Sequence, residues 1–377
     1  MKKIKIIFLV LMVLMNSIFA AGCWNYKEVD QFSIVAGVAV DIGKNSKYEL
    51  TAELIQISGG KEAKTTSKTV TVEGKTIFDA ARNMISISGK KLYWSHAKVI
   101  ILSKEAANNG VKNAIEWYTR DSETRESVYV LISKGETAKE IFDGQGTTES
   151  IMSFILQDII KNQMSLSKSS VTDILKYSIE SQQKGASTII PAVSLKLMND
   201  KMVPEVIGTA IIKNDKLAGF LNGEETKDLS FIRNEVKGGV LVEEMQVNNL
   251  PAIITLEIFN SKTKVSFSAE AEDLVINIDI DTTVAIDEVE GTVDLSDEKE
   301  INRLKQITEN TIKERIETLI IKIKSEYDAD IFCFGIKLWQ NNPQVWKSVK
   351  NNWEDVLSNA EVNVKTNVHI KNSAIVS

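Results

Sequence analysis

The apolar and polar residues of this chain alternate most regularly over residues 274–286, which read Leu274-Val275-Ile276-Asn277-Ile278-Asp279-Ile280-Asp281-Thr282-Thr283-Val284-Ala285-Ile286. Every second residue from Leu274 to Ile286 is apolar or threonine, whereas Asn277, Asp279 and Asp281 fall on the other face. Because successive side chains of a strand point to opposite faces, this pattern predicts a strand with one buried and one wet face. The two aspartates lie outside any calcium-loop motif, which favours a solvated strand face over a metal site.

The segments around this strand predict a C-terminal domain at residues 251–377. Residues 297–326 predict a long helix, because apolar side chains recur there every three or four residues. A strand is predicted from residue 253, with a turn at Asn260-Ser261, and a last strand at 361–371. The long amphipathic helix should cover the apolar face of an antiparallel sheet.

The N-terminal part alternates between strand-like and helix-like segments. Strands are predicted at 32–42, 47–57, 66–73, 92–102 and 127–133, and helices at 75–88, at 104–119 and in two pieces within 148–185. This alternation predicts an α+β domain at residues 23–197. Pro191 and Pro204 bracket a polar run, so a small middle domain is expected at 198–250. The predicted fold class is therefore α+β and multidomain, with mixed or antiparallel sheets packed by helices.

The composition argues against several classes of function. The chain has 377 residues and a formal net charge of −6, which disfavours nucleic-acid binding and electrostatic capture by anionic lipid. Its two histidines, His96 and His369, fall in different predicted domains, so a Ser-His-Asp or Cys-His site has little to build from. No nucleotide-binding loop, zinc-protease helix or nucleophile elbow is present in the sequence. We therefore expect a protein that is not an enzyme and has no metal or cofactor.

Residues 1–22 have the layout of an export signal, with three lysines, then an apolar run, then small residues directly before Cys23. This order is typical of a bacterial lipoprotein signal, which is cleaved before the cysteine so that Cys23 receives lipid. Ala20 stands where such signals usually have Leu. Two alternatives remain open. One is an ordinary secretory signal cleaved near Ala21, and the other is an uncleaved transmembrane anchor, for which the apolar run is short.

The second of the two cysteines, Cys333, lies in an apolar run. It is predicted to be a buried small hydrophobe rather than a nucleophile. If Cys23 carries lipid, Cys333 has no partner within the chain, and we expect no disulfide framework.

Three stretches carry a resemblance to a known family. They are Gly22-Cys23-Trp24-Asn25-Tyr26-Lys27-Glu28-Val29; Leu92-Tyr93-Trp94-Ser95-His96-Ala97-Lys98-Val99-Ile100 with the later Arg120-Asp121-Ser122-Glu123-Thr124-Arg125; and Asp330-Ile331-Phe332-Cys333-Phe334-Gly335 with Pro343, Trp346 and Trp353. In this order and spacing the chain resembles the C-subunit lipoproteins of bacterial spore germinant receptors, the Ger(x)C family. Asn25 stands where the family usually has Asp, and Cys333 stands where Gly is common.

The resemblance implies a receptor subunit without catalytic activity. Such a protein is anchored by lipid at the outer face of the inner spore membrane. It assembles there with the integral-membrane A and B subunits of the same receptor, which responds to nutrients and starts germination. The implied fold is a multidomain α+β body.

Further expectations concern two groups of residues and two alternative functions. Arg120, Glu123 and Arg125 could dock a partner, or they could be solvated charges at a helix end. Trp346 and Trp353 are seven residues apart, which predicts one face of a short helix packed in the core against the last strand.

The alternative function is a solute-binding lipoprotein of a membrane transporter, which would need two similar lobes of parallel sheet. A surface hydrolase is a further alternative, but the sequence contains no motif for its catalytic residues.

Overall fold

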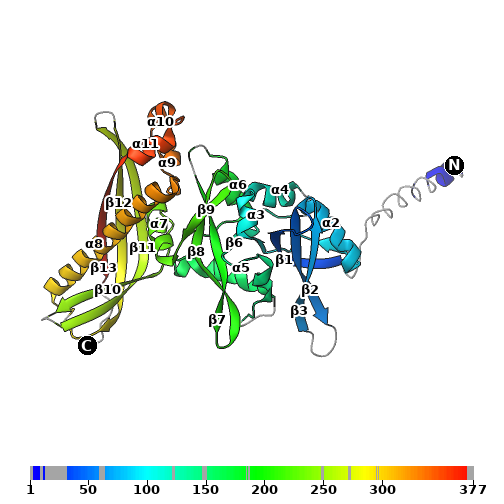
Figure 1. The fold of residues 1–377 in the computed structure, drawn as a ribbon, viewed down its shortest axis with the longest axis horizontal. Coiled ribbons are helices and arrows are strands. Elements are labelled where there is room, and N and C mark those ends of the chain that lie inside the picture. Colours follow the sequence, from blue (N-terminus) through cyan, green and yellow to red (C-terminus); the bar gives the residue numbers. More distant parts are fainter. Residues whose placement is uncertain are drawn as a thin grey trace.

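The chain folds around two β-sheets that lie next to each other, one in each half of the sequence (Figure 1). This computed structural model describes residues 3–8, 12, 32–58, 64–120, 124–146, 151–183, 185, 187–247, 250–270, 273–293, 295 and 297–371. The first sheet has nine strands and the second has four. The α+β, multidomain class predicted from the sequence is thereby confirmed. Over the described residues the two sheets differ in size and topology, so they are not the two similar lobes that the transporter alternative requires.

The nine-stranded sheet and its helices come from the N-terminal part of the chain. In chain order the elements are β1 (Phe32–Ile42), β2 (Tyr48–Ser58), β3 (Lys64–Gly74), α2 (Ile77–Ser88), β4 (Lys91–Tyr93), β5 (Val99–Leu102), α3 (Lys104–Asn108), α4 (Val111–Arg120), β6 (Tyr129–Ser133), η2 (Lys139–Asp143), α5 (Met152–Asn162), η3 (Gln163–Ser165), α6 (Ile174–Ser181), β7 (Thr188–Met198), β8 (Lys201–Lys213) and β9 (Lys216–Leu221).

The centre of this sheet is parallel, and antiparallel hairpins extend it on both sides. Strands β1, β5, β6 and β7 pair in parallel, while β2 and β3 flank one side and β8 and β9 the other. On β5, Ile100 and Leu102 pack with α2, α3 and α4, whereas Val99 and Ile101 pack with α5. All four residues of β5 are apolar because helices cover both faces of this parallel part of the sheet.

Two elements predicted as single units are divided in the structure. The strand predicted at 92–102 is interrupted after β4 by a turn in which the Ala97 N–H donates to the Trp94 carbonyl at 3.0 Å. The helix predicted at 104–119 is divided into α3 and α4 at Gly110, whose φ of 115° is incompatible with a continuing helix. Both breaks involve tertiary contacts. At the first, Trp94 turns into the core against Trp117, and after the second, the N–H groups of Val111 and Lys112 donate to Asp215.

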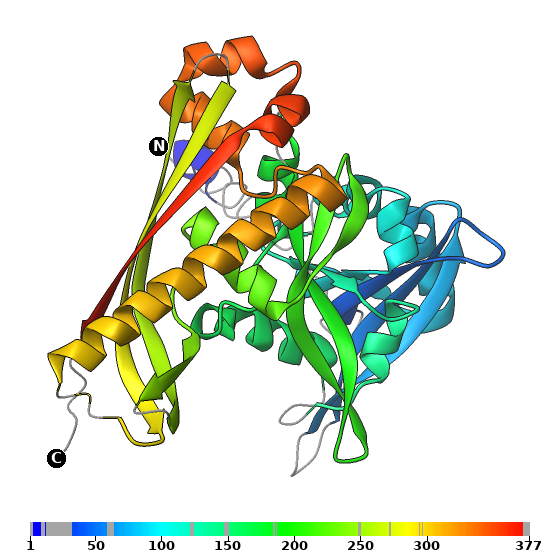
Figure 2. The ribbon, with the colours of Figure 1, turned by 60° about the vertical axis from the view of Figure 1, so that its left-hand side comes forward.

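The C-terminal elements follow in the order α7 (Gly223–Arg233), β10 (Val240–Val247), β11 (Leu250–Glu270), β12 (Asp273–Glu290), α8 (Glu298–Lys322), the π-helical turn η4 (Ile323–Tyr327), α9 (Phe334–Asn341), α10 (Pro343–Val349), α11 (Trp353–Asn359) and β13 (Glu361–Lys371). Helix α8 runs across the sheet β10-β11-β12-β13 (Figure 2). Its buried side chains include Leu304, Ile312 and Ile316, which share one core with Ile276 and Ile278 of β12. The long helix over a sheet is thus confirmed. Strand β13 pairs in parallel with β12, so this sheet is mixed rather than purely antiparallel.

The turn predicted at Asn260-Ser261 is wrong. Strand β11 continues through both residues, with a register shift between Ile258 and Asn260 where it pairs with β12. The Ser261 hydroxyl is buried and lies 3.0 Å from the Thr282 hydroxyl on the neighbouring strand. Two consecutive small polar residues resemble a turn in the sequence, but here a bulge and a cross-strand hydrogen bond accommodate them within the sheet.

The predicted boundary between residues 197 and 198 falls inside the β7–β8 hairpin. The two strands pair from Thr188 opposite Ile212 to Met198 opposite Lys201. Because β8 then pairs with β9, the nine-stranded sheet extends to Leu221. The proposed middle segment is therefore bonded to the N-terminal sheet through its first part, and α7 leads from there to the second sheet.

The motif beginning at Asp330 lies where the two halves meet. Asp330 is only 4% exposed, and its carboxylate accepts hydrogen bonds from the backbone N–H of Phe334 at 3.0 Å and of Gly335 at 2.7 Å. The Trp353 indole N–H donates to the same carboxylate at 3.1 Å. The Asp330 carbonyl accepts from the Ser187 N–H in the N-terminal half. Burial raises the pKa of this carboxyl above its ordinary value. One residue therefore organises the motif and joins it to the first sheet.

The prediction that Trp346 and Trp353 share one short helix is wrong, although both are buried as expected. Trp346 lies on α10 and Trp353 begins α11, and their rings meet edge to face with centroids 5.4 Å apart. A Cβ atom added to Gly335 would lie 3.0 Å from the Trp353 indole nitrogen, and one added to Gly185 would lie 2.6 Å from the Trp353 ring. The tryptophan pair thus packs against glycines from both halves of the chain.

An ion pair joins the halves beside this motif. The Arg233 guanidinium donates to Glu180 at 2.6 Å and to the Ile331 carbonyl at 3.0 Å, and its side chain is 4% exposed. Cys333 follows with a φ of 61°, the left-handed region that glycine adopts without strain. Its thiol is partly buried, and burial raises its pKa to about 11. The structure therefore explains why the resembling family commonly has Gly there.

Candidate partner-docking cleft

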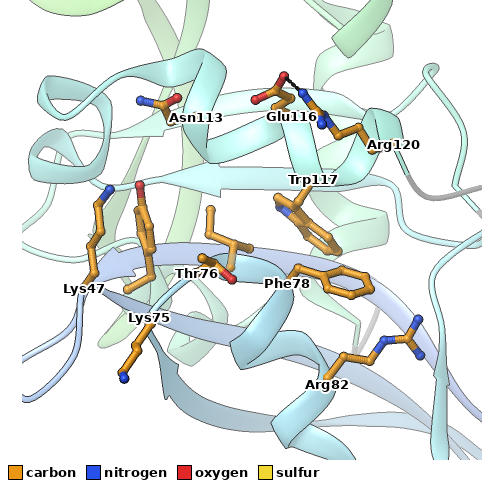
Figure 3. A pocket seen from close by; sticks show the side chains of 11 residues that line it. Lys47, Lys75, Thr76, Phe78, Arg82, Asn113, Glu116, Trp117 and Arg120 are labelled. Carbon is orange, nitrogen blue, oxygen red and sulfur yellow. Dashed lines mark hydrogen bonds and ion pairs between the residues drawn. The ribbon is translucent and has the colours of Figure 1, made fainter.

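A cleft of about 730 Å³ opens in the N-terminal domain between α2, α4 and the start of β2 (Figure 3). Most of the side chains around it carry either a positive charge or an aromatic ring. The lining residues are Lys47, Tyr48, Lys75, Thr76, Ile77, Phe78, Arg82, Asn113, Glu116, Trp117 and Arg120. Arg120 is the only one of these that the sequence had singled out.

The start of α2 is held in place by reciprocal hydrogen bonds. The Thr76 hydroxyl accepts from the Asp79 N–H at 3.1 Å, and the Asp79 carboxylate accepts from the Lys75 N–H at 3.0 Å. This cap satisfies amide groups that an α-helix leaves unbonded in its first turn. It also places Phe78 and Arg82 one turn apart on the cleft side, with the Arg82 guanidinium 4.7 Å from the centre of the Phe78 ring.

The opposite wall, α4, is positioned by a residue from a distant turn. The Lys112 N–H donates to the Asp215 carboxylate at 2.7 Å, and the Val111 N–H donates to the Asp215 carbonyl at 2.9 Å. Asp215 lies in the turn between β8 and β9, so the far edge of the sheet anchors the start of the helix. On the inner side of α4, Trp117 packs edge to face with Trp94 and Tyr118 at centroid distances of 5.2 Å.

Trp117 is 8% exposed, and its indole N–H has no hydrogen-bond partner among the described residues. A buried indole nitrogen usually finds an acceptor. Phe78 beside it is 43% exposed, which is high for a phenylalanine. The cleft therefore presents apolar ring surface, and behind it lies a buried indole N–H that none of the described residues satisfies.

The rim of the cleft carries more positive than negative charge. Among the described lining residues, Lys47, Lys75, Arg82 and Arg120 accompany one carboxylate, Glu116. The Arg120 guanidinium donates to Glu116 at 2.6 Å, and this hydrogen bond lowers the pKa of the Glu116 carboxyl. The side chains of Arg120 and Glu116 remain 76% and 38% exposed. In a chain of net charge −6 this is a local basic surface, suited to recognising an acidic group beside an apolar one.

The structure places only part of the predicted charged cluster. Arg120 ends α4 and lines the cleft, and Arg125 is exposed a few residues later. Glu123 lies outside the described residues, as does Cys23. The carboxylate that Arg120 contacts is Glu116, four residues earlier on the same helix, which the sequence argument had not named.

Phe78 and Arg82 were also missed, although the sequence held a signal for Phe78. The predicted helix at 75–88 has an apolar stripe through Ile77, Ala81 and Met84, and Phe78 lies off that stripe. A large aromatic residue on the polar side of an amphipathic helix is a candidate contact residue.

The acidic, cysteine and histidine side chains of the described residues are dispersed. No three His, Cys, Asp or Glu side chains gather closely enough in the described ranges to hold a metal ion. His96 packs beside Tyr93, whereas His369 on β13 lies 3.3 Å from Asp281 in the other sheet. Of the helices that are described, none is long and apolar enough to cross a membrane.

Comparison with known proteins identifies two matching family domains. Residues 25–195 match the family described as the spore germination protein N-terminal domain, and residues 207–374 match the one described as spore germination B3/GerAC-like, C-terminal. The first match ends within β7 and the second begins within β8, on either side of the hairpin tip.

Individual relatives match over almost the whole chain. Spore germination protein B3 of Bacillus subtilis (strain 168) is 29% identical over 367 residues, which cover 95% of this chain and 94% of that protein. Spore germination protein A3 of the same organism is 25% identical, with 96% of each chain covered. A crystal structure of the GerBC protein has the same fold, with a TM-score of 0.58 and 23% sequence identity over 89% of this chain and 96% of that one.

Proposed function

The chain belongs to the spore germination family of germinant-receptor C subunits, and from this premise we propose that it is the lipid-anchored C subunit of a nutrient germinant receptor. Lipid at Cys23 tethers it to the outer face of the inner spore membrane, where it assembles with the integral-membrane A and B subunits. It acts through contacts rather than by turnover. The observation that carries the proposal is the order of a lipoprotein-type signal, Cys23, and then both family domains at 25–195 and 207–374.

The anchor is strong enough to hold the body at the membrane without other help. Each buried methylene contributes about 0.8 kcal/mol, and two acyl chains on one cysteine give stable attachment. The acidic body adds no general attraction to anionic lipid. A tether of this kind raises the local concentration of the subunit beside its membrane partners.

The cleft between α2 and α4 supplies the contact with a partner subunit in this proposal. Its basic rim and exposed ring favour an acidic partner segment that carries an apolar side chain. Because the Arg120–Glu116 pair is exposed, it adds little to the stability of the fold and can rearrange when a partner binds.

Complementation of a gene deletion tests the anchor. In a strain with no other nutrient receptor, the deletion should abolish nutrient-triggered release of dipicolinic acid, and the wild-type gene should restore it. Cys23→Ala should lose labelled palmitate, leave the membrane fraction, and restore germination poorly. Cys333→Gly is the matched control, because it removes the other thiol at a position whose backbone suits glycine. A Cys23→Ala protein that stays in the membrane after a salt wash would contradict the anchor, and normal germination of the deletion strain would contradict the function.

A further inference from the structure

The β7–β8 hairpin ends in large apolar side chains that project into solvent. Leu197 is 67% exposed, Met198 46% and Met202 41%. Leu197 pairs with Met202 across the two strands, and the turn between them consists of Asn199 and Asp200, both with positive φ. This backbone matches the tight two-residue turns that suit hairpins. The apolar side chains are therefore held at the end of a well-ordered protrusion.

A second hairpin carries a similar side chain toward the same side of the molecule. Ile57, near the end of β2, is 70% exposed and pairs with Thr65 of β3. Figures 1 and 2 show the far ends of β2 and β3 and the end of the β7–β8 hairpin at the lower side of the domain in both views. Exposed apolar residues are common singly on surfaces, but two protrusions directed the same way need an explanation.

The chain enters the fold at the same end as the β2–β3 hairpin. Strands β1 and β2 are antiparallel, with Val35 opposite Leu54. Phe32, three residues before Val35, and Ile57, three residues after Leu54, both lie beyond this end of the β1–β2 pairing, where Phe32–Ile34 turn to pair with β4. Nine residue steps separate Cys23 from Phe32, so an extended chain spans at most about 30 Å between them. A lipid on Cys23 keeps this edge of the domain close to the bilayer.

The charges around the tips suit an anionic lipid surface. Lys196 and Lys201 flank Leu197 and Met198, and Lys64 and Lys68 are exposed on β3. On the β7–β8 hairpin the acidic residues near the tip are Asp200 in the turn and Glu205, which pairs with Lys196 at 3.0 Å. Apolar side chains with lysines beside them sit at the boundary between acyl chains and headgroups, with the ammonium groups in the headgroup layer. A narrow protrusion of Leu and Met needs no matching pocket there, as it would on a protein partner.

From these observations we propose that the tip of the β7–β8 hairpin and the end of β2 at Ile57 insert shallowly into the membrane surface, so that this end of the N-terminal domain faces the bilayer. The inference rests on the proposed function only in that Cys23 brings the chain to a membrane. It assigns Leu197, Met198, Met202 and Ile57 as lipid contacts, and it gives the tethered body one orientation instead of free rotation about its anchor.

A fluorescent probe at the tip tests the proposal. The lipidated full chain with Leu197→Cys and Cys333→Gly is labelled with the polarity-sensitive dye NBD. It is then reconstituted into vesicles of phosphatidylcholine and phosphatidylglycerol with or without spin-labelled acyl chains. NBD emission should shift to the blue and be quenched by the spin label. The same probe at Leu175→Cys, a 47% exposed position on α6 away from the tip, should stay unquenched.

A second measurement uses the chain without lipid. A Cys23→Ala chain should keep only weak vesicle binding, which a salt wash removes. In this background Leu197→Asp with Met202→Asp should weaken sedimentation with the same vesicles at least about tenfold, because two apolar contacts are replaced by charges. Leu175→Asp should change it little.

These measurements distinguish a failure of the membrane-contact proposal from a failure of the lipid anchor at Cys23. A vesicle-bound protein whose probe at residue 197 stays in water overturns the proposal, even if the anchor is correct. A full chain that does not float with vesicles contradicts the anchor. In that case a hexahistidine tag in place of Cys23 holds the chain on nickel-chelating lipid, and the same probe comparison decides the proposal.

Discussion

The junction around Asp330 and the cleft around Arg120 use the same kinds of residue in opposite ways. Each combines charged side chains with a pair of tryptophans in edge-to-face contact. At the junction Asp330 is 4% exposed and accepts three hydrogen bonds, whereas at the cleft Arg120 is 76% exposed and, among the described residues, forms its ion pair with Glu116 on its own helix. Burial is what separates them. A buried charge with all its partners belongs to the fold, and an exposed one can serve recognition.

The largest effect is expected at the junction. Asp330→Ala leaves the N–H groups of Phe334 and Gly335 and the Trp353 indole N–H buried without an acceptor. The free energy of unfolding should fall by about 3–5 kcal/mol, because each lost bond is to a charged group. Urea denaturation followed by tryptophan fluorescence measures this loss, since Trp353 itself reports on the site.

The control for this change is Asp328→Asn, two residues earlier. Asp328 is 51% exposed, pairs with Lys213 at 3.0 Å and has a φ of 46°, which Asn also adopts readily. Its effect should stay within about 0.5 kcal/mol. Equal losses for the two variants would mean that burial does not distinguish the junction from the surface.

An intermediate case is Asp228 on α7, which faces Arg315 of α8 at 2.9 Å, with Glu224 and Lys227 nearby. Burial raises the pKa of this carboxyl from 3.8 to about 6. Between these two values the unfolded chain has released its proton while the folded chain still holds it. The contribution of Asp228 to stability therefore falls as pH rises from about 4 to about 6, by up to about 3 kcal/mol, and is constant above that range.

Asp228→Asn checks this sign, because the amide does not titrate. The unfolding free energy of the wild type minus that of Asp228→Asn should decrease between pH 4 and 6, measured by urea denaturation at each pH. A difference that grows over this interval would show that Arg315 controls the pKa more strongly than burial does.

A smaller effect concerns the reactivity of Cys333. Because burial raises its pKa to about 11 from 9.0, the thiolate fraction near pH 8 is about a hundredfold lower than for an ordinary thiol. A Cys23→Ala chain should therefore react with DTNB about a hundredfold more slowly when folded than in 6 M guanidinium. Equal rates in the two states would show that the Cys333 thiol is as accessible as the exposed residues of the cleft, and not buried like Asp330.

The smallest effect on stability is expected at the cleft. Arg120→Glu should change the free energy of unfolding by no more than about 0.5 kcal/mol. If the cleft docks a partner, the same variant should lose co-purification with the A and B subunits and slow germination. Lys161→Glu on α5 is the matched control, because it makes the same charge change at a 53% exposed residue paired with Asp158. If the Arg120→Glu protein still co-purifies with the A and B subunits, the cleft is not part of the interface.

The prediction from sequence succeeded where a pattern repeats along one element. The alternation of residues 274–286 identified β12, and the stripe of residues 297–326 identified α8, because strand and helix repeat their side-chain directions every two or 3.6 residues. The prediction failed where a single residue departs from the periodicity of its element because it contacts a residue far away in the sequence. The bulge at Asn260 and the inward turn of Trp94 are both of this kind.

The same limit applied to the candidate site. A run of charges near Arg120 was visible in the sequence, but the ring of Phe78 and the guanidinium of Arg82 come from another helix. Sequence spacing alone cannot show that α2 and α4 face each other. Asp215, which caps α4, lies 103 residues away from Lys112.

The sequence by itself indicated most of the elements and the motifs that identify the family, because these depend on residues close together in the chain. Only the tertiary structure decided which charges are buried. Glu53 on β2 is 1% exposed, and it accepts hydrogen bonds from the N–H groups of Met152 and Ser153 at the start of α5, at 2.8 and 2.9 Å. No local pattern predicts that contact, because the partners of a buried carboxylate are set by how helices pack on the sheet and not by their distance in the sequence.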